Sequence, residues 1–548
     1  MTYTHFKRLL AILAIAALAA CGVTTPARAP SPGGPAVAPT PLGGPILVGV
    51  GDSLTAGEQS DALLGVPTTS SASAYPGGAV YPGQENGWFA IVYDCVSAIG
   101  GSCNHSPIPI AAPAVPTNPS VKVIPLINAP GIGTQIVLSA TTGLADTQSG
   151  CSAFNDSAFA QSGWPSTRVN ATTGIADLGV PGITMHEAVA MTGPYEGPPV
   201  QSSSGCGYPT IKGDPTSGGL QSLVESENQT WLPVLGEFQK AYGSNTTMLN
   251  VAVGMKPKLV TVWLGANDLL KYIFSAGTAP ASDTPQQMAT DLTKIVKSLS
   301  ATGSKVLVAD LPTLLPTSGR AVPQFFSQTY LAGDLTPLIV LLSGGAIPPA
   351  NASQYAGLIV ADLGTKYGIT AGGYLTESGF LATLEQALPL IEANPADPDF
   401  GAIELDPSGP GSGLGSAYIT PAFAAKIQAL NAAYNQAIDG VATGSGSNVA
   451  LVPIDTLFTQ ASTNGIAIPG LGTVTLQFGG GLVSWDGLHP SNLGYAIIAN
   501  DFIATADMSF GMTIPPLSAL QIGEIAANDP YDPFVLKAGN PNSPFPLP

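Results

Sequence analysis

Two polar groups near opposite ends of the chain carry residue types that nucleophilic catalysis uses. Ser53 stands in Gly-Asp-Ser-Leu directly after a short apolar run, where a strand would turn into a helix. A serine at such a turn can present its hydroxyl above a sheet and direct its own backbone N–H at an oxyanion. Asp486 and His489 lie three residues apart, far along the chain. At that spacing the carboxylate can fix the imidazole tautomer so that the far nitrogen faces a serine.

Two further polar groups lie between them. Gly182, in Gly-Val-Pro-Gly, can bring a second backbone N–H close to a substrate. Asn267 and Asp268 form a polar pair directly behind a wholly apolar run. Each group alone is common, since Gly-Asp-Ser-Leu arises by chance, Asn-Asp occurs in ordinary turns and Asp-x-x-His can also bind a metal. Their order along the chain, at predicted strand ends, is what favours a joint role.

The elements that must position these groups are visible as alternating strand and helix patterns. Short, continuous apolar runs of the kind found in strands buried on both faces lie at 46–50, 258–264, 305–309 and 448–453, with a weaker fifth run at 174–178. Helical patterns cover 284–299, 421–441 and 492–506. Strands separated by helices predict a parallel sheet with helices on both faces, in which functional groups gather at the carboxyl ends of the strands.

The four groups, taken in this order, resemble the SGNH or GDSL-type serine hydrolase superfamily. The resemblance implies Ser53 as the nucleophile, His489 as general base and acid, and Asp486 as the carboxylate that orients the histidine. It also implies an oxyanion hole made by the Ser53 N–H, the Gly182 N–H and the Asn267 side-chain amide. The fold that it implies is a three-layer α/β/α flavodoxin-like sandwich with a five-stranded parallel sheet. It implies no metal and no organic cofactor.

The chain departs from the family pattern in one residue and in spacing. The second group usually opens with Asn, and here that position is Asp177, which we expect to alter local hydrogen bonding but not the role of the glycine. The groups lie much farther apart than in compact members, so we expect one hydrolase domain over 46–510 with large loop insertions. These insertions, at about 60–170, 190–250 and 315–420, are expected to wall the active site, and a Pro-rich tail follows at 511–548.

The first residues predict export. Two basic residues precede an apolar run that suits a signal-peptide core and is too short to span a bilayer. Cys21 follows Leu-Ala-Ala directly after this run and resembles the lipobox of bacterial lipoproteins. We therefore expect a signal peptide at 1–20, then a lipidated cysteine with a Pro/Ala-rich tether at 21–45. An ordinary secretory signal cut after Ala20 is the alternative. With the lipidated cysteine, the body is expected in the bacterial cell envelope, periplasmic or at the cell surface, with the lipid as its membrane contact.

Four cysteines remain after Cys21, an even number in an oxidising compartment. Two disulfides are therefore expected among Cys95, Cys103, Cys151 and Cys206, and pairing each cysteine with its nearest neighbour is the simplest of three connectivities. Zinc binding is disfavoured because the chain has no Cys-x-x-Cys spacing.

Composition removes several classes of protein. The 35 acidic and 17 basic side chains give a formal net charge of −18, so the chain has no basic surface for nucleic acid. Hydrophobic residues make up 45% of the chain, enough to exclude disorder throughout. His186 is expected at a helix start rather than as a ligand, and Asp52 and Asp268 are expected to stabilise turns or helix starts.

Together these patterns predict a lipid-anchored serine esterase or lipase that hydrolyses carboxylic esters through an acyl-enzyme. The expected partner is an ester substrate, either a lipid or an acylated small molecule, because the insertions are rich in Leu, Ile, Ala and Pro and poor in charge. Two alternatives stay open, namely a carbohydrate O-acetylesterase and a surface binding protein that keeps an inactive hydrolase fold. The oligomeric state is left open as well.

Overall fold

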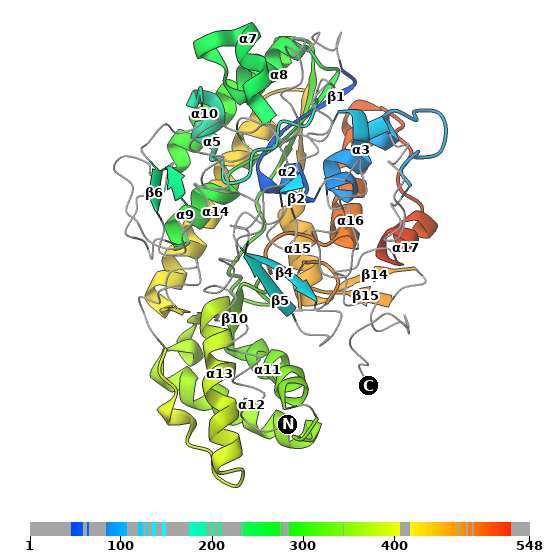
Figure 1. Cartoon of the computed structure of the whole chain (residues 1–548). Helices are drawn as coiled ribbons and strands as arrows, with labels where there is room; N and C mark the ends of the chain where they lie inside the picture. The colour runs from blue at the N-terminus through cyan, green and yellow to red at the C-terminus, as the bar shows by residue number, and fades with distance from the viewer. Residues whose placement is uncertain are drawn as a thin grey trace, which may run out of the picture.

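A parallel four-stranded sheet forms the centre of the molecule (Figure 1). The computed structural model describes residues 45–58, 63–64, 84–106, 119–123, 128–129, 134–138, 145–149, 175–193, 199–201, 207–209, 231, 234–274, 277, 284–343, 345–405, 417–469, 472–477, 480–484 and 487–527. The strands follow the spatial order β1 (Leu47–Gly51), β8 (Leu259–Trp263), β9 (Lys305–Ala309) and β13 (Val449–Val452), and every pairing is parallel. The four predicted strands are confirmed. Their continuous apolar runs are buried on both faces, as a sheet between two helical layers requires.

The expected fifth strand does not form as such, and the described sheet has four strands. Asp177 makes one isolated parallel bridge with Gly49, and three backbone hydrogen bonds of 2.9–3.1 Å run between residues 176–180 and β1. The Asp177 carboxylate accepts the Gly179 N–H at 2.8 Å, so this N–H, which faces away from β1, is used by a local hydrogen bond. Pro181 follows and has no N–H to donate.

Helices cover both faces of the sheet, which gives three layers (Figure 1). One face carries α3 (Trp88–Val96) and α16 (Asn492–Phe510), and the other carries α8 (Met248–Met255), α10 (Pro285–Ser300) and α14 (Pro421–Gly444). The three predicted helices correspond to α10, α14 and α16. In α10 and α14 a threonine N-cap followed by proline fixes the start of the helix.

The core between the sheet and α16 is aromatic. Trp88 stacks on Phe502 with ring centroids 4.1 Å apart, and the Trp263 ring of β8 lies 5.8 Å from that of Trp88. This packing joins α3 and α16 to β8, the strand that precedes Asn267. It therefore helps to fix the position of the sheet that carries the polar groups.

A second hydrophobic core belongs to a helical insertion between β9 and α14. It contains α11 (Gln328–Leu342), α12 (Pro349–Lys366) and α13 (Glu377–Ala393) with the antiparallel strands β10 (Phe325–Ser327), β11 (Tyr374–Thr376) and β12 (Tyr418–Ile419). Phe326 and Phe380 stack at its centre, 4.1 Å apart. The insertion extends from one end of the central body (Figure 1).

Shorter elements complete the described structure. They are α2 (Ser53–Ala56), α5 (Met185–Ala190), α7 (Gln239–Tyr242), α9 (Ala266–Phe274), α15 (Ile454–Thr463), α17 (Ala519–Ala527) and the two-stranded pairs β2–β3 (Leu63–Leu64, Asn128–Ala129), β4–β5 (Thr134–Leu138, Ala145–Ser149), β6–β7 (Pro199–Gln201, Gly207–Pro209) and β14–β15 (Ile466–Ile468, Gly472–Val474). Residues 511–527, expected to begin a tail, pack against α16 through α17.

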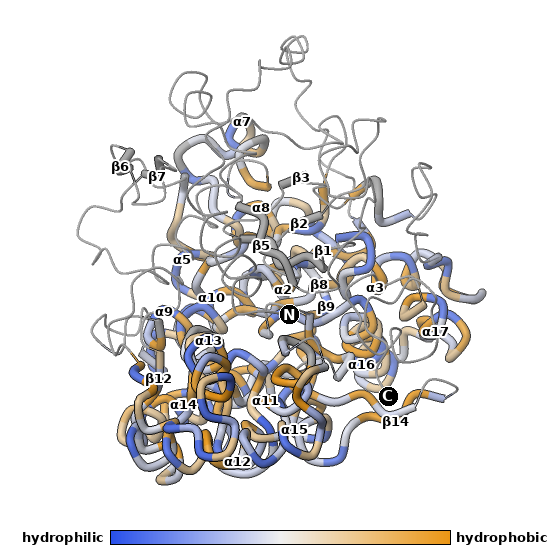
Figure 2. The backbone as a smooth tube through the Cα atoms, turned by 60° about the horizontal axis from the view of Figure 1, so that its bottom comes forward, coloured by the Kyte–Doolittle hydropathy of each residue, from blue (hydrophilic) through white to orange (hydrophobic). Residues whose placement is uncertain are grey.

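Hydrophobic and hydrophilic residues alternate along α12 and α14, as in helices with one buried face (Figure 2). In the described part of the chain, no helix is both long enough and apolar enough to cross a membrane.

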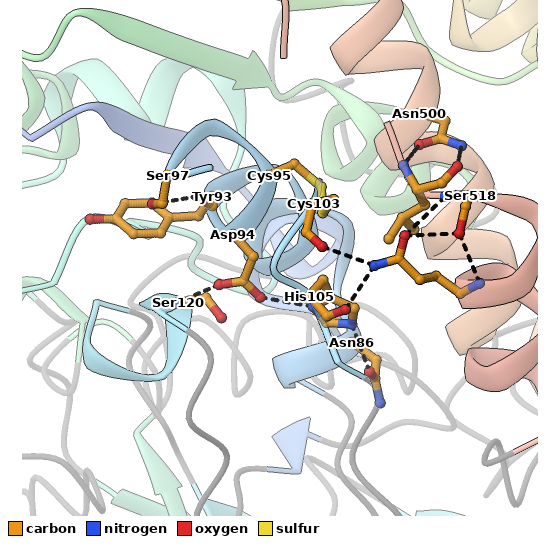
Figure 3. Close-up of a disulfide and its surroundings, with 12 residues drawn as sticks. Asn86, Tyr93, Asp94, Cys95, Ser97, Cys103, His105, Ser120, Asn500 and Ser518 are labelled. Carbon is orange, nitrogen blue, oxygen red and sulfur yellow. Dashed lines mark hydrogen bonds and ion pairs between the residues drawn. A yellow bond between two sulfur atoms is a disulfide. The ribbon is translucent and has the colours of Figure 1, made fainter. Parts of the chain in front are cut away.

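A disulfide ties α3 to the loop that follows it (Figure 3). Cys95 and Cys103 are bonded, which confirms that predicted pair, whereas Cys151 and Cys206 lie outside the described residues. Next to the disulfide, the fully buried His105 Nδ1 lies 2.8 Å from an Asp94 carboxylate oxygen. The other oxygen of that carboxylate accepts a backbone N–H from the 119–122 turn at 2.7 Å.

Candidate active site

The serine and histidine of the first and last polar groups are in contact. Ser53 is the first residue of α2, directly after β1, and Asp52 caps this helix by accepting the Leu54 N–H at 3.1 Å. The Ser53 Oγ lies 2.9 Å from the His489 Nε2. Both side chains are buried. The predicted role of Asp52 at a helix start is confirmed.

The loop that carries His489 is held by its own backbone and by the start of α16. The Ser484 N–H donates to the His489 carbonyl at 2.7 Å. Ser491 is the N-cap of α16, and its hydroxyl donates to the Gly481 carbonyl at 2.7 Å. Asp486, the predicted orienting carboxylate, lies outside the described residues, as does Cys21.

Gly182 lies in a tight turn after the segment that runs beside β1. The Ile183 N–H donates to the Val180 carbonyl at 3.2 Å, and the φ of Gly182 is 84°. Proline followed by a residue with positive φ is the pattern of a type II turn, which favours glycine at that position. Within the described structure, the N–H groups of Gly182 and Ser53 have no acceptor.

Asn267 joins this turn to the serine. It lies in the first turn of α9, which starts directly after β8 and Gly265. Its buried side-chain amide donates to the Ile183 carbonyl at 3.1 Å and lies 3.4 Å from an Asp52 carboxylate oxygen. The structure therefore brings Ser53, Asn267, His489 and the Gly182 turn together from four separate parts of the chain.

A cavity opens beside the serine and histidine. Apart from Ser53, Asn267 and His489, its lining is apolar and consists of Leu54, Trp263, Ala266, Leu270, Pro312, Leu314, Val322, Phe458 and Leu488. The sequence predicts the insertion at about 315–420 as part of the wall, and Val322 comes from it, but the other apolar lining residues are not predicted from the sequence. The wall comes partly from the loop between β9 and β10 and partly from α15. No motif marks these segments, and in the sequence their apolar side chains resemble any other core residues.

The wall of the cavity is held by hydrogen bonds from neighbouring helices to its backbone. Asn431 of α14 accepts the Leu314 N–H at 3.1 Å, and Asp455 of α15 accepts the Thr313 N–H at 2.8 Å. These bonds fix the loop's backbone, so the apolar side chains have a defined place next to Ser53.

Asp52 is a buried ionisable group of the site. Burial raises the pKa of Asp52 to about 7, although the Leu54 N–H and the nearby His489 both act to lower it. The carboxyl group is therefore close to half protonated at neutral pH. Its contact with Asn267 was not apparent from the sequence, because 215 residues separate the two.

Other predicted positions have structural roles. His186 is near the start of α5 and pairs with Asp291 of α10 at 2.9 Å, which confirms its predicted place. Asp268 accepts the N–H of the first residue of α5 at 3.0 Å, as expected of a residue that stabilises a helix start. Among the described residues, no group of three His, Cys, Asp or Glu side chains could hold a metal ion.

Comparison with known proteins found no matching family model, no matching curated protein and no matching solved structure. The function is therefore argued from the geometry of the site.

Proposed function

We propose that the protein is a serine esterase of the SGNH type, which hydrolyses carboxylic esters through an acyl-enzyme on Ser53. The observation that carries the proposal is the 2.9 Å contact between the Ser53 hydroxyl and the His489 Nε2. It supports a nucleophile with its base in place. The N–H groups of Ser53 and Gly182, which have no acceptor among the described residues, belong to the chain neighbours of Asp52 and Ile183, the two residues that the Asn267 amide contacts, and this supports an oxyanion hole.

The proposed reaction uses these groups in sequence. The Ser53 Oγ attacks the ester carbonyl carbon while His489 takes the hydroxyl proton. The oxyanion accepts hydrogen bonds from the Ser53 and Gly182 N–H groups and from one Asn267 amide hydrogen. The amide carries two hydrogens, and we assign the one with the longer contact, 3.4 Å to Asp52, to the oxyanion.

His489 then passes its proton to the alcohol oxygen as the C–O bond breaks, which leaves the acyl group on Ser53. Water attacks the acyl carbonyl, His489 takes a proton from that water, and the acid departs as Ser53 regains its hydrogen. Asp486 is proposed to orient His489 in both steps.

The fold fits this proposal at a finer level. The bridge and hydrogen bonds that join residues 176–180 to β1 support a doubly wound, flavodoxin-like sheet as part of the proposal, and in such sheets sites form at the carboxyl ends of strands. The apolar cavity supports a hydrocarbon acyl group as the part of the substrate bound next to Ser53. Lipidation of Cys21 in the cell envelope remains part of the proposal, and labelled fatty acid should be incorporated by the wild type but not by Cys21→Ser.

A fluorophosphonate probe tests the proposal, because it reacts with an activated serine. We expect covalent labelling of wild-type protein at Ser53 and none in Ser53→Ala or His489→Gln. His186→Gln is the matched control, since this histidine is half exposed and serves α5 and α10, and it should be labelled at the wild-type rate. Folded wild-type protein that does not react would exclude the esterase.

Rates on acyl esters of increasing chain length, measured beside acetylated sugars, define the substrate. We expect hydrolysis of the acyl esters. Activity confined to the acetylated sugars would overturn the assignment of the cavity to a hydrocarbon chain.

A further inference from the structure

We propose that Asp268 and the Glu187–Lys271 ion pair are positioning residues that hold two oxyanion donors, Gly182 and Asn267, at a fixed separation. The inference rests on the proposed esterase function, because it assigns these side chains a task in the same reaction. None of them faces the cavity beside Ser53.

The two donors need such a connection because they belong to different segments. Gly182 lies in the turn that leads into α5, a helix of six residues, and Asn267 lies at the start of α9. A strand and its turn fix each donor locally, but neither fixes the distance between them. An oxyanion hole works only when its donors are held in place before the charge develops.

The first connection is a pair of neighbouring hydrogen bonds. The Asp268 carboxylate is fully buried and accepts the Met185 N–H at 3.0 Å, one of the N–H groups that a helix start leaves without an intrahelical partner. The preceding residue, Asn267, donates to the Ile183 carbonyl at 3.1 Å. Two successive residues of α9 thus hold the backbone immediately after Gly182.

The second connection lies one turn farther along α9. The Lys271 ammonium is 3.1 and 3.2 Å from the two carboxylate oxygens of Glu187 on α5. The same carboxylate accepts the Thr184 N–H at 2.8 Å and completes a capping box. Burial alone would raise the pKa of Glu187, but the charge of Lys271 and the hydrogen bonds with Thr184 outweigh it, so that the pKa lies below its usual range.

The opposite side of α5 supplies a matched control. His186 of α5 pairs with Asp291 of α10 at 2.9 Å, on a helix that carries no oxyanion donor. Both pairs attach α5 to the body, but only the pair with Lys271 attaches it to α9. A general loss of α5 anchoring and a specific loss of donor spacing can therefore be separated.

The experiment compares Asp268→Ala and Glu187→Gln with Asp291→Asn. Gln at position 187 keeps the capping box and loses the charge attraction to Lys271. We expect kcat to fall about 10- to 100-fold in Asp268→Ala and about threefold or more in Glu187→Gln, with KM changed less than about twofold, because the donors are displaced only slightly. Asp268→Asn keeps an oxygen that can accept the Met185 N–H and should recover much of the activity.

Two further measurements separate positioning from general damage. A trifluoromethyl ketone adds the Ser53 oxygen to its carbonyl carbon and carries an oxyanion, so its Ki should rise in proportion to the fall in kcat/KM. The acid limb of the pH–rate profile, which reports protonation of the His489 base, should stay where it is in wild type. Asp291→Asn should keep wild-type kcat and Ki, even if its melting temperature falls.

The outcomes distinguish the two proposals. Active wild-type enzyme with unchanged kcat and Ki in Asp268→Ala and Glu187→Gln would overturn the positioning role and leave the esterase standing. Equal losses of kcat in Glu187→Gln and Asp291→Asn would also overturn it, since both would then report α5 anchoring. Wild-type protein that is folded but neither hydrolyses esters nor reacts with fluorophosphonate would exclude the esterase itself.

Discussion

Asp177 is a buried acid whose side chain has one strong local hydrogen bond, donated by the Gly179 N–H. Burial raises the pKa of Asp177 to about 8, against the lowering effect of that N–H. A carboxyl whose folded pKa is raised stabilises the protein fully below its unfolded pKa, and that contribution is lost as pH rises through the folded pKa. At pH 9 the folded protein must therefore hold a buried charge at this position.

Asp177→Asn removes that charge and keeps an oxygen for Gly179. We expect the variant to be more stable than wild type at pH 9, by about 1–2 kcal/mol, and to differ least from it at about pH 4, where the unfolded chain also binds this proton in part. Thermal unfolding of both proteins at the two pH values is the measurement. A variant less stable than wild type at pH 9 would contradict the buried position of the charge.

Asn267 is the one proposed oxyanion donor that uses a side-chain amide, since the other two donors are backbone N–H groups. We expect Asn267→Ala to lower kcat by about 10²–10³-fold with little change in KM, because the lost hydrogen bond strengthens in the transition state. Steady-state kinetics on one ester are sufficient. Asn250→Ala is the control, since that amide donates to the Asn245 carbonyl on the exposed side of α8. Equal kinetics in both variants would remove Asn267 from the oxyanion hole.

For individual residues, the sequence predicted the Ser53–His489 pair better than the residues that surround it. Ser53 and His489 could be predicted as partners because Ser53 follows an apolar run, His489 stands three residues after a carboxylate, and the chemistry of each needs the other. Most of the apolar cavity wall could not, because Leu314 and Phe458 look like ordinary core residues until the fold brings them beside Ser53. Asp52 was placed at a helix start correctly, but its contact with Asn267 depends on tertiary packing.

Among the elements, the four strands were predictable and the fifth was not. Apolar runs ending in glycine or proline mark β1, β8, β9 and β13 with little ambiguity. The 174–178 run lies beside β1 and makes one isolated bridge with it, at Asp177. Hydrophobicity therefore predicted where this segment lies but not how little of it pairs as a strand.

The Cys95–Cys103 disulfide connects two elements, because it ties α3 to the loop that carries His105. Its two cysteines are eight residues apart, so it closes a short loop. We expect the double variant Cys95→Ser/Cys103→Ser to lose about 2–3 kcal/mol of unfolding free energy through loop entropy. Urea unfolding measures the loss, and reduced wild-type protein should match the variant. Equal stability of oxidised wild type and the double variant would mean that the bond does not constrain the unfolded chain.

Across the whole molecule, several buried carboxyl groups share one pH response. Burial is the first cause in each case, and it raises the pKa to about 6–8 in Asp52, Asp177, Asp310, Asp334 and Asp501. All five bind a proton in the folded state at pH values where the unfolded chain has released it. Their contribution to stability is therefore fully present below about pH 4, the ordinary range of an aspartate, and is lost as the pH rises from there through the folded values of about 6–8.

We expect the melting temperature to be highest in mildly acidic solution and to fall by several degrees from pH 5 to pH 9. Glu187, with its lowered pKa, is ionised in both folded and unfolded chains over this window and does not oppose the trend. Self-repulsion at a net charge of −18 acts in the same direction. Calorimetry across the range is the measurement, and a melting temperature that rises from pH 5 to pH 9 would contradict the expectation.

The helical insertion leaves the body and returns to it at nearly the same place. Ser327 of β10 and Ile419 of β12 both lie opposite Tyr374 of the central strand β11. Two strand spacings, about 10 Å, therefore separate the departing and returning chain. A short linker could therefore close the gap that removal of the helices would leave, although contacts with the body such as the Arg320–Asp334 ion pair at 2.7 Å would be lost. In genetic terms, a unit whose two ends lie close together can be gained, lost or exchanged in a single recombination event while the catalytic body keeps its reading frame.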